Sequence, residues 1–162
     1  MQLKQAENIA RKYVALLSPL CDRIEVAGSV RRQKPEVNDI EIVAIPSGRT
    51  LEEYFTLVNQ WYKVKGDACG KYTQRKLPEG IYLDLFHATP KNWGMIYAIR
   101  TGSDQFSHNV LAVGWKKKGF KSQGGVLYDD NTHRAKFIYE EEDLFKLIGV
   151  PFVEPHLREL YG

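Results

Sequence analysis

The sequence predicts an α+β fold in two parts: a mixed β-sheet with flanking helices, followed by a smaller part of helices and short strands. Apolar residues recur at helical spacing near the N-terminus, and a β-branched run and a hairpin pattern come after them. The segment Thr101-Gly102-Ser103 is the candidate hinge. We therefore predict two domains, at residues 1–100 and 101–162.

Helix and strand signals alternate through the first 100 residues. The first helix places Leu3, Ala6, Ala10, Tyr13 and Leu17 on one face. The patterns predict a helix over 3–17, a strand over 23–27, a short helical turn over 30–34 stopped by Pro35, a strand over 40–45, a helix over 51–61, hairpin strands over 72–77 and 81–86, and a helix over 93–99.

Helix signals open and close the second part. Ser103 is suited to cap a helix whose first turn holds Asp104 and which ends at Gly119 after three lysines. Gly124-Gly125 indicates a turn between short strands. A helix with an acidic start is predicted over 140–148.

Composition is typical of a globular protein, because 43% of the residues are hydrophobic and 27% are charged. Cys21 and Cys69 have no metal-ligand spacing with histidine, and reduced thiols fit an intracellular protein. No apolar run approaches transmembrane length. We expect a soluble intracellular protein that does not bind membranes.

Charge is unevenly distributed along a chain whose net charge is +3. Lys116, Lys117, Lys118 and Lys121 form a local basic cluster, while residues 140–143 are all acidic. Each run is either a solvated surface or, for the lysines, a contact for a polyanion such as nucleic acid.

The most informative motif combines a basic turn with paired carboxylates. Gly28-Ser29-Val30-Arg31-Arg32 precedes Asp39 and Glu41, which are two residues apart on a predicted strand and so share a face. Asp84 interrupts an apolar strand and must face either water or a cation. A phosphate-binding turn beside clustered carboxylates indicates metal-dependent phosphoryl or nucleotidyl transfer.

At these residues the chain resembles the family X DNA polymerases, the polymerase beta-like branch of the nucleotidyltransferases. Gly28 to Arg32 is similar to the triphosphate-binding motif of this family, and Asp39-Ile40-Glu41 to its first metal-binding pair. Thr101-Gly102-Ser103-Asp104 resembles the palm–thumb junction, where the family has a cis Gly–Ser peptide. Residues 149–159 resemble the closing segment of the family.

The resemblance implies a nucleotidyltransferase palm at 1–100, a thumb at 101–162, and a monomeric DNA-directed DNA polymerase that fills gaps in DNA repair. It implies two Mg²⁺ ions, with Mn²⁺ as a substitute, a dNTP substrate and a gapped or primer-template duplex. The compact palm-plus-thumb form that the resemblance implies fits a cytoplasmic enzyme of viral or phage origin. The implied catalytic and metal-binding residues are Asp39, Glu41 and Asp84; the nucleotide-binding residues are Gly28, Ser29, Arg32, Gly102, Asp104 and Ser107; the DNA-binding residues are His108, Lys116, Lys117, Lys118 and Lys121.

Two alternatives follow from departures from the family pattern. His108 and Leu111 occupy the two positions that the resemblance implies for template contact, and the family often has an arginine at the position of Leu111. These departures favour a template-independent or small-acceptor nucleotidyltransferase. Glu41 replaces the usual second aspartate, and Ile99-Arg100 replaces an aromatic pair. These two changes favour a non-catalytic DNA-binding module.

Overall fold

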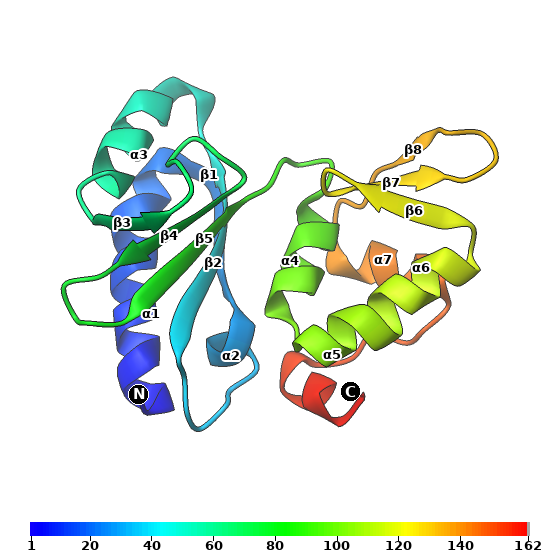
Figure 1. Cartoon of the computed structure of the whole chain (residues 1–162), viewed down its shortest axis with the longest axis horizontal. Helices are drawn as coiled ribbons and strands as arrows, with labels where there is room; N and C mark the ends of the chain where they lie inside the picture. The colour runs from blue at the N-terminus through cyan, green and yellow to red at the C-terminus, as the bar shows by residue number, and fades with distance from the viewer. Residues whose placement is uncertain (162) are drawn as a thin grey trace. The chain divides into compact units, whose positions relative to one another are not determined.

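A computed structural model describes residues 1–161 of the chain, which fold into two compact units (Figure 1). The first unit is Met1–Ala88, and the second begins at Thr89. The division therefore comes earlier in the chain than the boundary that we predicted between residues 100 and 101. Its cause is helix α4 (Trp93–Thr101), which packs against α7 (Glu141–Ile148) of the second unit.

A five-stranded mixed sheet forms the centre of the first unit and confirms the α+β prediction. The strand order is β1-β2-β5-β4-β3; β2 and β5 are parallel, and all other neighbours are antiparallel. The strands are β1 (Cys21–Ala27), β2 (Asp39–Pro46), β3 (Tyr62–Lys65), β4 (Tyr72–Lys76) and β5 (Tyr82–His87). Four of them were predicted, whereas β3 was not.

Alternation along the strands separates a core face from an open face. Ile40 and Ile42 of β2, and Leu83 and Leu85 of β5, are fully buried in one hydrophobic core. Helices α1 (Leu3–Leu17) and α3 (Leu51–Val58) contribute the other side of that core, as their apolar faces require. The residues at the alternate positions of these strands, including Asp39, Glu41 and Asp84, therefore project from the opposite face of the sheet.

The structure corrects two predicted helices of the first unit. The helix predicted over 51–61 ends at Val58, because the chain turns there and enters β3. The turn predicted over 30–34 is helix α2 (Gly28–Arg31) and begins directly after β1. Gly28 has a φ of +60°, which lets the chain leave the strand and enter the helix without an intervening loop.

The second unit surrounds its own core with helices and a three-stranded sheet. Its elements are α4, α5 (Asp104–Phe106), η3 (Ser107–Ala112), α6 (Val113–Lys117), β6 (Phe120–Gln123), β7 (Val126–Asp129), β8 (Ala135–Lys136), α7 and η4 (Pro155–Tyr161). The side chain of Ser103 accepts a hydrogen bond from the amide of Phe106, which confirms the predicted cap. The π-helical geometry of η3 and strand β8 were not predicted.

A buried arginine fixes the C-terminal segment to α7. The Nη1 atom of Arg158 lies 2.9 Å from Oε2 of Glu141, and its Nε donates to the carbonyl of Val153 at 2.9 Å. The rings of Phe106, Phe145 and Phe152 surround the guanidinium at 5.3–5.6 Å. The acidic run is thus partly structural, and a capping box between Glu140 and Asp143 uses two more of its carboxylates.

A neutral histidine connects α3, β5 and the β3–β4 loop of the first unit. Nδ1 of His87 donates to the carbonyl of Gly70 at 2.6 Å, so Nε2 accepts from the hydroxyl of Tyr54 at 2.7 Å. Burial lowers the pKa of His87 below its ordinary value of 6.5, although the bond to Gly70 acts in the opposite direction. No helix within residues 1–161 is long and apolar enough to cross a membrane.

We predict that acid destabilises the first unit partly through His87. Because the pKa of His87 is lower in the folded protein than in the unfolded chain, the unfolded chain takes up the proton first. The contribution of His87 to the free energy of unfolding is therefore complete above pH 6.5 and is lost as the pH falls towards the folded pKa. The free energy of unfolding in urea, measured between about pH 7 and about pH 5, should fall less steeply for His87→Asn than for the wild type. His156→Asn, at an exposed position, is the control; equal slopes for all three proteins would contradict the prediction.

Candidate functional site

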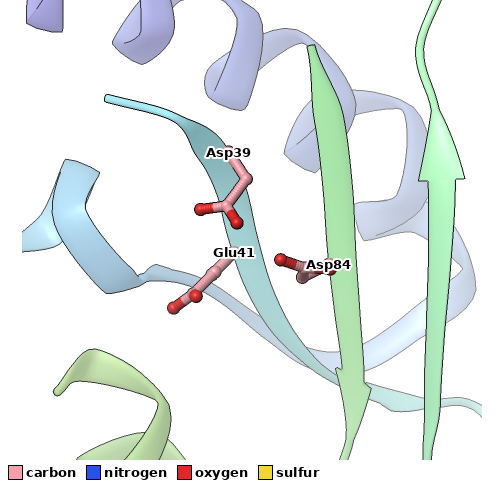
Figure 2. Close-up of side chains that lie close together, drawn as sticks. All are labelled: Asp39, Glu41 and Asp84. Carbon is pink, nitrogen blue, oxygen red and sulfur yellow. The ribbon is translucent and has the colours of Figure 1, made fainter. Parts of the chain in front are cut away.

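Three carboxylates meet on the open face of the first sheet. Asp39 and Glu41 lie on β2, and Asp84 lies on the adjacent parallel strand β5, directly opposite Glu41 in the register. One oxygen from each of the three lies within 4.8 Å of the others, and Figure 2 shows the side chains converging on the space beside β2. The structure therefore brings together the three residues that the sequence suggested as metal ligands.

Asp84 faces this cluster, and not open water. The residue is only 6% exposed. Its Oδ1 accepts hydrogen bonds from the hydroxyl of Tyr72 at 2.6 Å and from the side-chain amide of Gln74 at 2.8 Å. Burial, the bond to Asp84 and the negative charges of all three carboxylates raise the pKa of Tyr72.

The donor set fits a hard divalent cation. All three groups offer carboxylate oxygen, the ligand that Mg²⁺ and Mn²⁺ prefer, and they come from two hydrogen-bonded strands that hold them in place. Like charges at this separation repel one another, and a bound cation would remove that repulsion. Asp39, Glu41 and Asp84 could therefore hold a metal ion.

A glycine turn packs directly against this cluster. An ideal Cβ built on Gly28 would lie 2.3 Å from Oε2 of Glu41 and 2.7 Å from its Cδ. Glycine is required there both for this close approach and for the positive φ. Ser29 and Arg32 follow in and just after α2, and both are half-buried. Their assignment to the triphosphate remains a prediction.

The predicted site residues of the second unit differ in their exposure and in their contacts. The peptide between Gly102 and Ser103 is cis, as the resemblance implied, and Asp104 is exposed. The hydroxyl of Ser107 donates to the carbonyl of Ile99 at 2.8 Å, so it is engaged within its own unit. His108 is exposed, whereas Leu111 is fully buried in the core.

The basic cluster lies at the end of α6 and in β6. Lys116, Lys117, Lys118 and Lys121 are all exposed. None of the four forms an ion pair within residues 1–161. Their charge is therefore available to a polyanion, as the sequence suggested.

Tyr72 and Gln74 are site residues that the sequence reasoning missed. The signal was present, because the predicted hairpin turn at residues 78–80 fixes the pairing of its two arms and sets Gln74 opposite Asp84. Tyr72 lies two residues further along the same strand face. Both residues could have been expected to contact the third carboxylate.

Comparison with known protein families relates the second unit to a polymerase thumb domain. Residues 97–159 match the family model described as DNA polymerase beta thumb. No curated protein matches the chain. The match includes Gly102, Asp104, Ser107, His108 and the lysine cluster, and it supports a family X polymerase-like relationship and a role in DNA binding. The three carboxylates lie outside the matched residues.

We predict that Gly28→Ala damages the carboxylate cluster. The added methyl group must displace Glu41, so affinity for Mn²⁺, measured by the electron paramagnetic resonance of the free ion, should fall about tenfold or more. Gly80→Ala is the matched control, because Gly80 also has a positive φ, +91°, but has open space at its Cβ. It should lose about 1–2 kcal/mol of stability from the backbone alone and keep its Mn²⁺ affinity. Equal affinities for both variants would contradict the prediction.

Proposed function

We propose that this protein is a minimal DNA-directed DNA polymerase that adds deoxynucleotides to a primer 3′-hydroxyl at gaps or recessed ends. The observation that carries the proposal is the Asp39–Glu41–Asp84 cluster, in which one oxygen from each residue lies within 4.8 Å of the others. The thumb match over residues 97–159 adds a DNA-polymerase context to that cluster. Gap filling in DNA repair is the role that we propose for it.

The carboxylates would hold two Mg²⁺ ions, which supply charge stabilisation for the triphosphate and lower the pKa of the attacking hydroxyl. In the reaction the 3′-oxygen forms a bond to the α-phosphorus and the hydroxyl loses its proton. The bond from the α-phosphorus to the leaving pyrophosphate breaks. Ser29 and Arg32 would bind the triphosphate, since a hydroxyl and a guanidinium are donors that phosphate oxygens accept.

The second unit would bind the DNA. The exposed lysines at the end of α6 and in β6 are suited to phosphate contacts, which position a duplex without reading its sequence. Asp104 would lie near the incoming nucleotide and His108 near the template, as the resemblance implies. Both are exposed, so both side chains are accessible to a ligand.

A second candidate is a template-independent nucleotidyltransferase. The burial of Leu111 favours it, because a fully buried leucine cannot contact a template at the position where the family often has an arginine. The same carboxylates would serve either reaction. The two candidates differ only in whether the added nucleotide depends on the base opposite it.

We predict that the protein extends a labelled primer across a one-nucleotide gap when Mg²⁺ is present. With each dNTP supplied separately, only the complementary nucleotide should be added, and gel electrophoresis of the product measures it. Asp84→Asn should reduce the rate by a factor of about 10³ or more, because it removes charge from the cluster that would bind the catalytic metals.

Glu7→Gln is the control for a partly exposed carboxylate of the same unit, on helix α1, which packs on the core side of the sheet, and it should leave extension unchanged. Addition of any nucleotide, or addition to a bare single strand, would favour the template-independent candidate. A protein that binds gapped DNA without extending it would instead be a non-catalytic DNA-binding module.

We also predict that the lysine cluster binds DNA phosphate. Each phosphate contact that is lost lowers the slope of log Kd against log salt by about 0.9, so Lys117→Gln/Lys121→Gln should lower it by about 1.8. Lys4→Gln/Lys146→Gln removes the same charge from other exposed positions and is the control. Fluorescence anisotropy of a labelled duplex over a salt series measures both slopes. Equal changes in the two variants would reject a specific role for the cluster.

A further inference from the structure

Two neutral donors converge on one oxygen of Asp84. The hydroxyl of Tyr72 and the side-chain amide of Gln74 both donate to Oδ1, at 2.6 Å and 2.8 Å. The residues described here provide no donor to Oδ2. The two oxygens of this carboxylate are therefore not equivalent.

This arrangement follows from the strand register. Glu41 of β2, Asp84 of β5 and Gln74 of β4 form one continuous cross-strand row, so Asp84 lies between a carboxylate and an amide. Tyr72 pairs with Phe86 in the neighbouring row on the same face. Donors on one side of Asp84 and acidic groups on the other give its carboxylate a defined direction.

The Tyr72 hydroxyl is itself held in place by packing. Its ring stacks on that of Phe86, with centroids 4.8 Å apart and planes 23° from parallel. The ammonium group of Lys65 lies 5.7 Å from the centre of the same ring. A fixed ring places its hydroxyl at one point, which is what a positioning group requires.

We propose that Tyr72 and Gln74 are positioning residues that turn the Asp84 carboxylate so that Oδ2 is presented to a divalent cation. The inference rests on the proposed function of the three carboxylates as a metal site. The terminal torsion of an aspartate side chain otherwise has a broad range of allowed values. Hydrogen bonds therefore have to set the plane of the carboxylate. With two donors at Oδ1, the orientation is fixed before any metal binds.

The identity of the donors supports this role. A lysine or an arginine would satisfy Oδ1 equally well but would cancel the charge that attracts the metal. A phenol and an amide satisfy the same oxygen and leave the full negative charge on the carboxylate. The pair therefore orients Asp84 without competing with a cation.

The test is direct Mn²⁺ binding to the full chain without nucleotide or DNA, measured by electron paramagnetic resonance of the free ion. Tyr72→Phe removes only the hydroxyl and keeps the ring, and Gln74→Leu removes the amide at similar size. Each variant should bind Mn²⁺ about tenfold more weakly than the wild type, as expected for loss of an outer-shell partner. Added to Asp84→Asn, Tyr72→Phe should cause little further loss, because its effect passes through Asp84.

Tyr62→Phe is the matched control, because Tyr62 is 74% exposed on β3. It should leave Mn²⁺ affinity unchanged. Thermal unfolding of each metal-free variant shows that the fold is retained. A purely structural role for Tyr72 would lower the melting temperature and weaken Mn²⁺ binding equally with and without Asp84.

The outcomes separate the two proposals. If Asp84→Asn weakens Mn²⁺ binding but Tyr72→Phe and Gln74→Leu do not, the positioning role is wrong and the metal site stands. An equal loss from Tyr72→Phe in the Asp84→Asn background also rejects positioning. If the wild type binds no Mn²⁺, or Asp84→Asn binds it as the wild type does, the metal site and the proposed function are both wrong.

Discussion

The register between β2 and β5 holds charged groups together that would otherwise separate. It sets Glu41 opposite Asp84, and strand alternation places Asp39 on the same face. One oxygen from each then lies within 4.8 Å of the others, where a pair of negative charges repels by a few kcal/mol at the effective dielectric constant of a protein surface. The strands cannot move apart without losing the core on their other face, so the backbones of these three residues stay close together.

That constraint explains the neighbours of the cluster. Gly28 has no side chain because any Cβ would meet Glu41, and its positive φ turns the chain from β1 into α2 at the same point. Tyr72 and Gln74 satisfy one oxygen of Asp84 without adding positive charge. Buried leucines and isoleucines on the opposite face hold the strands in register from behind. The core and the site thus use alternate residues of the same strands.

The sequence predicted the elements whose signals are local. Helix α1 has the predicted bounds, and the shared face of Asp39 and Glu41 follows from period-two alternation, which is readable without tertiary information. Strand β3 was missed because an alternation of only four residues, Tyr-Lys-Val-Lys, is too short to stand out, and all four residues are exposed. The two compact units divide before α4 and not after it, because the packing of α4 against α7 is a contact distant in sequence. The burial of Leu111 likewise depends on a core that no local pattern specifies.

The most direct test of the metal site is a crystal structure of the full chain grown with Mn²⁺, with the ion located by its anomalous scattering. We expect a peak within coordination distance, about 2.0–2.4 Å, of oxygens from Asp39, Glu41 and Asp84, with Asp84 binding through Oδ2 alone. We also expect that Tyr72 and Gln74 still donate to Oδ1. A crystal in which the three carboxylates bind no metal at millimolar Mn²⁺ would contradict the metal site and the proposed reaction with it.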